Sequence, residues 1–129
     1  MTQSLHPTAQ KGFSSAAELY QQVRPNYPVE IVSWLQDRLQ IHENSTVIDL
    51  GSGTGKFLPY LKQTHANITA VEPIGEMLQQ LQQAYPDIKT LQAFSHNIPV
   101  NDQQIDAVIC AQSFHWFDNI ETLTEIHRV

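Results

Sequence analysis

Apolar and polar positions follow two different periods along this chain, and together they predict a regular succession of strands and helices. Short apolar runs bounded by turn residues predict four strands, over residues 46–50, 68–71, 89–93 and 105–111. Apolar residues at helical spacing predict helices over residues 15–23, 28–39, 55–64, 75–85 and 119–128. Strands that alternate with helices are typical of the α/β class with a largely parallel sheet.

The most informative segment is the first predicted strand and the turn after it, V-I-D-L-G-S-G-T-G-K-F over residues 47–57. Its three alternating glycines leave the backbone without side-chain cover, which favours close approach by a ligand. The spacing excludes a dinucleotide fingerprint, because Lys56 takes the place of the third glycine. It also excludes a phosphate loop, because Leu50 and Phe57 replace the first glycine and the hydroxyl residue. A plain strand-to-helix turn, with glycines for tight packing, remains the alternative.

Two acidic residues accompany the first two predicted strands. Asp49 is the one charge on an apolar strand, and a buried charge usually has a partner. Glu72 ends the second predicted strand, where a carboxylate can accept hydrogen bonds from both hydroxyls of a ribose. The alternative for Glu72 is a solvated strand end.

The segments after the third and fourth predicted strands also carry distinctive residues. The first is F-S-H-N-I-P over residues 94–99, and the second is A-Q-S-F-H-W-F over residues 111–117. An aromatic run beyond a strand's carboxyl end suits the wall of a pocket. A hydrophobic plug under the next helix is the alternative.

These motifs, in this order, resemble the class I S-adenosylmethionine-dependent methyltransferases. The run at 111–117 and Y-Q-Q-V-R-P-N-Y-P at 20–28 are similar to a small-molecule branch that includes trans-aconitate methyltransferase-like proteins. The resemblance implies a Rossmann-like, mostly parallel sheet with flanking helices, S-adenosyl-L-methionine as cofactor and a small-molecule acceptor. Two positions of the loop at 94–99 depart from the family pattern: Phe94 replaces a polar residue and His96 replaces a common Glu.

The resemblance also implies roles for individual residues. The expected cofactor-binding residues are Asp49, Gly51, Ser52, Gly53, Gly55, Glu72, Pro73, Met77, Ser95, His96 and Gln112. Tyr20, Arg24 and Trp116 are expected to bind the acceptor. Arg24 is equally suited to the cofactor's carboxylate or to a structural salt bridge. His115 is the candidate general base.

The charge composition limits the classes of partner that the chain is expected to bind. Thirteen acidic residues against seven basic ones give a formal net charge of -6, and the basic residues form no cluster. This balance argues against nucleic acid or an anionic membrane as the main partner. The six histidines lack a spaced partner set, so no metal site is expected. Without a long apolar run or a signal-peptide core, a cytoplasmic protein is expected.

We expect one domain over residues 1–129, with residues 1–12 as a mobile arm. The chain is expected to be the N-terminal portion of such a domain, truncated after about four strands in the order 3-2-1-4. The fourth strand would then be an apolar edge. We expect it to be covered by a homodimer, a swapped pairing or further residues. Two alternative functions remain: a cofactor-binding fragment or module without turnover, and another kind of nucleotide-binding α/β protein.

Overall fold

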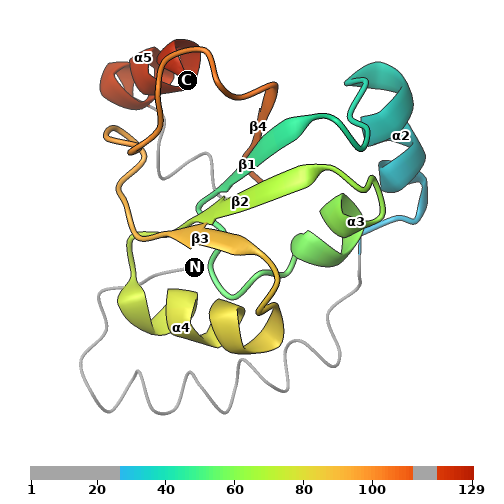
Figure 1. Cartoon of the computed structure of the whole chain (residues 1–129), viewed down its shortest axis with the longest axis horizontal. Helices are drawn as coiled ribbons and strands as arrows, with labels where there is room; N and C mark the ends of the chain where they lie inside the picture. The colour runs from blue at the N-terminus through green and yellow to red at the C-terminus, as the bar shows by residue number, and fades with distance from the viewer. Residues whose placement is uncertain (1–26, 112–118) are drawn as a thin grey trace.

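The computed structural model describes residues 27–111 and 119–129. Within them, four parallel strands form one sheet in the order β3-β2-β1-β4 (Figure 1). The strands are β1 (Thr46–Leu50), β2 (Asn67–Val71), β3 (Lys89–Leu91) and β4 (Ala107–Ile109). The predicted α/β class, the parallel pairing and the strand order are confirmed. The mobile arm predicted over residues 1–12 and the helix predicted from residue 15 lie outside the described residues.

In the described part of the chain, four helices accompany the sheet: α2 (Glu30–Arg38), α3 (Leu58–Lys62), α4 (Gly75–Ala84) and α5 (Ile120–Arg128). The largest difference from prediction is α3, which begins at Leu58 rather than at residue 55. Gly55 has a φ of 92°, a left-handed conformation that a right-handed helix cannot include. Pro59 lies in the first turn of α3, where its missing N–H removes no helical hydrogen bond.

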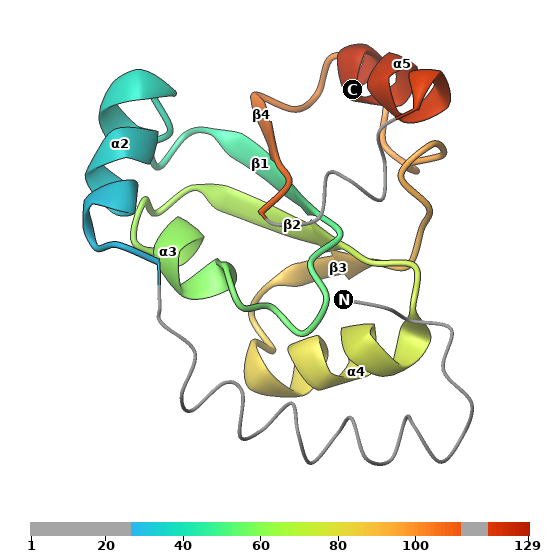
Figure 2. The ribbon, with the colours of Figure 1, turned by 180° about the vertical axis from the view of Figure 1, so that it is seen from behind.

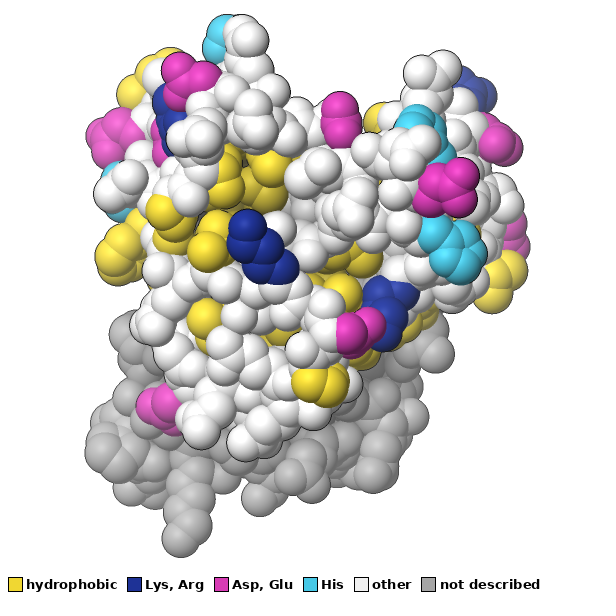
Figure 3. Space-filling view, viewed as in Figure 1, with side chains coloured by type: hydrophobic (Ala, Val, Ile, Leu, Met, Phe, Trp, Pro, Cys, Tyr) yellow, Lys and Arg dark blue, Asp and Glu magenta, His cyan; other side chains and the backbone are white. Residues whose placement is uncertain are grey.

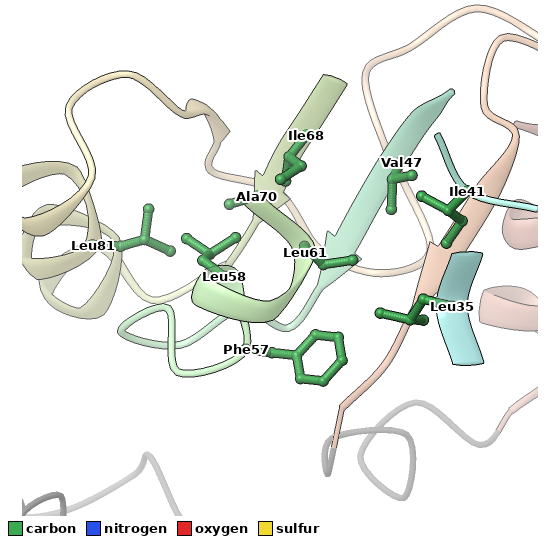
Figure 4. Close-up of a cluster of buried hydrophobic side chains, with 9 residues drawn as sticks. All are labelled: Leu35, Ile41, Val47, Phe57, Leu58, Leu61, Ile68, Ala70 and Leu81. Atoms are coloured by element: carbon green, nitrogen blue, oxygen red, sulfur yellow. The ribbon is translucent and has the colours of Figure 1, made fainter. Parts of the chain in front are cut away.

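Helices cover both faces of the sheet. Side chains on alternate positions of a strand point to opposite faces, so Val47 and Ile48 belong to different core clusters. On one face, α2, α3 and α4 pack against β1 and β2 (Figure 4). The buried residues of this first core cluster are Leu35, Ile41, Val47, Phe57, Leu58, Leu61, Ile68, Ala70 and Leu81. The other face of the sheet carries α5 (Figures 1 and 2). There, Ile126 of α5 and Ile98 pack with Ile48, Leu50 and Val71.

The buried face of α5 is not the one that the apolar pattern predicts. Ile120, Leu123 and Ile126 recur at helical spacing, but Ile120 and Leu123 are 73% and 44% exposed. Thr122 is fully buried instead, one turn before Ile126, which packs against the second core cluster. A polar residue therefore occupies the core-facing position of the first turn of α5.

The described surface has no strong concentration of basic side chains on the face that Figure 3 shows: Lys and Arg lie apart there, with carboxylates between them. None of the helices within residues 27–111 and 119–129 has the length and apolar character needed to cross a membrane.

Candidate functional site

The turn after β1 is shaped by three glycines with positive φ: 70° at Gly51, 59° at Gly53 and 92° at Gly55. The backbone N–H groups of Gly51 and Ser52 both donate to the carbonyl oxygen of Val71, at 2.8 and 3.1 Å. The turn is therefore tied to the last residue of β2. It lies at the carboxyl edge of the sheet, where open α/β sheets bind their ligands.

Glu72 joins this turn to the start of α4. Its Oε1 accepts from the N–H of Gly53 at 2.8 Å, and its Oε2 accepts from the N–H of Ile74 at 3.0 Å. The side chain is only 4% exposed, and burial raises its pKa, while the two backbone bonds act in the opposite direction. A carboxylate has about four acceptor positions, so each oxygen retains capacity for a further donor.

The second and third glycines of the turn have different surroundings. A Cβ at Gly53 would meet no atom within 4 Å, so this part of the backbone faces open space. A Cβ at Gly55 would lie 3.0 Å from both Leu58 Cδ1 and Tyr85 Cε2, inside the packed core. Gly53 thus leaves room for a ligand, whereas Gly55 is required for packing under α3 and α4.

Asp49 is the one buried polar side chain of the described residues that has an atom without a hydrogen-bond partner. It is 2% exposed, and its Oδ2 has no partner within residues 27–111 and 119–129. Its pKa is raised from 3.8 to about 7: burial is the main cause, the hydrogen bond with Ser52 lowers the pKa, and nearby Glu72 raises it. An unpaired buried carboxylate is costly. A positively charged or hydrogen-bond-donating ligand would satisfy it.

The loop after β3 begins beside Glu72, whose N–H donates to the carbonyl oxygen of Leu91 at 3.1 Å. Ser95 is buried, and its hydroxyl lies 2.7 Å from that of Thr122 in α5. His96 is exposed and stacks on the exposed ring of Phe94, with centroids 5.6 Å apart. The structure therefore places Ser95 inward and His96 outward on this loop.

A cluster of charged side chains on α5 holds the same loop, and sequence reasoning missed it. Glu125 Oε2 accepts from the N–H of Ile98 at 2.6 Å. Arg128 donates to the carbonyl oxygens of Ile98 and Val100 at 2.8 and 2.9 Å, and to Asp102 Oδ1 at 2.7 Å. The hydrogen bond from Arg128 lowers the pKa of Glu125. The one available signal was the i,i+3 spacing of Glu125 and Arg128.

Two surface depressions lie away from these residues, at the amino ends of the strands. One is lined by Thr46, Asn67 and Lys89, the first residues of β1, β2 and β3. The other lies between the residues that precede β1 and the start of β4. Neither is lined by the unpaired carboxylate of Asp49 or by the glycine turn, so the carboxyl edge remains the candidate site.

The structure brings together most of the predicted cofactor residues that it describes. Asp49, Gly51, Ser52, Gly53 and Glu72 are linked by the contacts given above. Pro73 and Met77 follow Glu72 into α4, and Met77 is half-buried. Predicted residues outside the described part of the chain are Tyr20, Arg24, Gln112, His115 and Trp116. Within the described part, no three His, Cys, Asp or Glu residues are arranged to hold a metal ion.

The described end of the motif over residues 20–28 is held by ring contacts. Tyr27 packs edge-on against Phe57 and Tyr60, with ring centroids 5.0 and 5.4 Å apart. Phe57 directly precedes α3, so this aromatic cluster brings the end of the motif to the segment that follows the glycine turn.

Known proteins with similar sequences are methyltransferases by name. Residues 48–129 match a family described as a methyltransferase domain. An uncharacterised methyltransferase-like protein of Schizosaccharomyces pombe is 40% identical over 120 residues, which cover 92% of this chain and 47% of the relative. An uncharacterised methyltransferase of Mycobacterium bovis is 38% identical over 117 residues, covering 91% and 46%. The chain thus spans about half the length of the curated relatives that it matches.

The fold is shared with a solved structure. A crystal structure described as a candidate S-adenosyl-L-methionine-dependent methyltransferase, from Methanococcus maripaludis, superposes with a TM-score of 0.78 at 25% identity. The match covers 99% of this chain and 62% of that one. The Rossmann-like architecture expected from the sequence is therefore confirmed.

Proposed function

The chain belongs to the methyltransferase domain family, and on this premise we propose that it binds S-adenosyl-L-methionine at the carboxyl edge of its sheet and transfers the methyl group to a small-molecule acceptor. The observation that carries the proposal is the buried, unpaired Oδ2 of Asp49, next to a glycine turn that faces open space at Gly53. This arrangement suits a ligand that combines a positive charge with a sugar and that approaches the backbone closely.

The described residues fit each part of this cofactor. Asp49 would complement its positively charged amino or sulfonium end. Glu72 has acceptor capacity left for two ribose hydroxyls, and its bonds to Gly53 and Ile74 already fix the carboxylate in place. Ser95 lies on the loop that would frame the adenine, and its backbone N–H would meet the ring. The turn would admit the cofactor without a clash, since Gly53 carries no side chain there.

When bound, this cofactor supplies a methyl group that is already activated on a sulfonium sulfur. The protein must then hold and orient the donor and the acceptor and exclude water, because an in-line transfer depends on the alignment of donor and acceptor. Asp49 and Glu72 would orient the two ends of the cofactor from a buried, preorganised position. Where the acceptor is a hydroxyl, His115 would take its proton as a general base; a carboxylate acceptor is already ionised and needs no base.

The acceptor side of the proposal rests on residues outside the described part of the chain. We propose that Tyr20, Arg24 and Trp116 contact the acceptor and that Gln112 lies near the methionine part of the cofactor. A trans-aconitate-like acceptor, which carries carboxylates, would match the positive charge of Arg24. With a hydroxyl acceptor, replacing His115 by Ala should abolish turnover and leave cofactor affinity unchanged; unchanged turnover with that acceptor would refute its assignment as base.

Calorimetric titration of the chain with S-adenosylmethionine, S-adenosylhomocysteine, NAD and ATP tests the cofactor. We expect binding of the two sulfur compounds and none of NAD or ATP. Binding of NAD or ATP alone would favour another kind of nucleotide-binding protein. Methyl transfer to a panel of small carboxylic acids, followed with a labelled methyl donor, then separates an enzyme from a binding module without turnover.

A further inference from the structure

A bond between two buried hydroxyls fastens the loop after β3 to α5. Ser95 Oγ lies 2.7 Å from Thr122 Oγ1, and the two residues are 7% and 0% exposed. Both groups are removed from water, where a hydroxyl without a partner is costly. The bond joins residues that are distant in sequence, so it fixes where two separate segments meet.

Thr122 is itself held in place. Its N–H donates to Asn119 Oδ1 at 2.8 Å, and Asn119 is the N-cap of α5. One turn further along the same helix, Glu125 accepts from the N–H of Ile98 at 2.6 Å. The helix therefore contacts the loop at two points, Ser95 from its capped first turn and Ile98 from the turn that follows.

Core packing alone does not account for a threonine at this position. Thr122 shares the core-facing side of α5 with Ile126 and Val129, both of which pack against the second core cluster. Valine has nearly the same shape and would fill the space without a polar atom. Replacing both members of a buried polar pair by apolar groups is often close to neutral for stability. A buried polar pair instead specifies one relative placement of the two segments that it joins.

We infer that Thr122 is a positioning residue for the cofactor's purine ring, acting through Ser95. The inference rests on the proposed function, in which the backbone at Ser95 meets the adenine while Glu72 binds the ribose. The loop leaves β3 beside Glu72, so its first residues are already fixed. The Ser95 hydroxyl is engaged with Thr122 and holds the loop from behind. Its backbone is the part that would face the ring.

The test compares Thr122→Val with two matched variants of the whole chain. Thr122→Ser keeps the hydroxyl, and Thr124→Val makes the same change on the exposed side of α5, where Thr124 Oγ1 donates to the carbonyl oxygen of Ile120 at 2.7 Å. Calorimetry measures affinity for S-adenosylhomocysteine and for S-inosylhomocysteine, in which hypoxanthine replaces adenine. We expect Thr122→Val to reduce the preference for the adenine compound by about fivefold, the value of one lost hydrogen bond. Both control variants should retain the preference.

A merely structural Thr122 would lower the melting temperature in Thr122→Val and leave the adenine preference unchanged, which would overturn the inference. Ser95→Ala breaks the same bond from the other side, so it should reduce the preference equally. The double variant should lose no more than either single one, and additive losses would also overturn the inference. If Thr122→Val does not fold, Ser95→Ala decides the question alone.

The wild-type chain separates this inference from the proposed function. If it binds neither sulfur compound, both are wrong. If it binds S-adenosylhomocysteine and the variants keep its preference, only the role of Thr122 is wrong.

Discussion

The two sides of the candidate site are held by different means. On the glycine side, residues 49–55 and 72–74 are joined by backbone bonds and by one carboxylate, all within the β1–α3–β2 unit and the residues directly after it. On the α5 side, the loop over residues 94–102 is held by side chains of a helix that comes much later in the chain. The first side is thus complete once β1 and β2 pair, whereas the second depends on how α5 docks. The glycine side should therefore determine the strength of cofactor binding, and the α5 side its discrimination between purines.

The largest expected effect is on the glycine side. Glu72→Gln removes the negative charge that would bind the ribose and weakens the bonds to Gly53 and Ile74. Hydrogen bonds to a charged group contribute about 1.5–3 kcal/mol, so affinity for S-adenosylhomocysteine should fall by about 100-fold. Glu76→Gln, which changes an exposed residue in the first turn of α4, is the control in the same titration. Equal affinities of the two variants would contradict the assignment of Glu72.

The next largest effects are expected from two glycines of the turn, one that affects stability and one that affects cofactor binding. Gly55→Ala places a Cβ 3.0 Å from Leu58 and Tyr85 at a φ of 92°, so we expect it to lower the free energy of unfolding by about 2–3 kcal/mol. Gly53→Ala meets no atom and bears only the cost of its positive φ, about 1 kcal/mol. It should nevertheless weaken cofactor binding, since its Cβ occupies the open space over the turn. Urea unfolding and calorimetry of both variants measure the two effects, and equal stability losses would contradict this account of the turn.

The raised pKa of Asp49 predicts how stability and cofactor affinity change with pH. Its pKa is raised from 3.8 to about 7, so between these values the folded, ligand-free protein binds more protons than the unfolded chain. Its contribution to stability is therefore present at low pH and is lost as pH rises through 7. A cationic ligand favours the ionised form, so affinity for S-adenosylmethionine should rise by about tenfold from pH 5.5 to pH 7.5.

Calorimetry across this range measures the effect, and Asp49→Asn is its control. The variant should show weaker binding with a flat pH profile. A pH dependence that survives in Asp49→Asn would assign the titration to another group.

The smallest effect is expected from the guanidinium on the α5 side. Arg128→Lys keeps the charge but cannot reach Glu125, Ile98 and Val100 together, because lysine lacks the fork of donors. Amide hydrogen exchange at Ile98 should rise several-fold, while affinity for S-adenosylhomocysteine falls by less than about threefold. Unchanged exchange at Ile98 would show that the bonds from Arg128 do not hold the loop.

Sequence reasoning succeeded where function is local in the chain. The strand, the alternating glycines and Glu72 follow one another within a single strand–helix–strand unit, so periodicity and spacing were enough to place them at one edge of the sheet. It failed on α5, because an apolar pattern assigns buried positions by hydrophobicity and overlooks a buried threonine. Thr122 and Glu125 acquire their roles only from Ser95 and Ile98, and no local pattern links those segments. The start of α3 was placed too early because helical spacing does not reveal the positive φ of Gly55.

The most direct test of the central claim is an amide NMR titration of the chain with S-adenosylhomocysteine. If the cofactor binds at the carboxyl edge, the largest shifts will be at Gly51, Gly53, Glu72 and Ser95, with little change at the amino ends of the strands. Shifts centred on Thr46, Asn67 and Lys89, or no shifts at saturating ligand, would contradict the account.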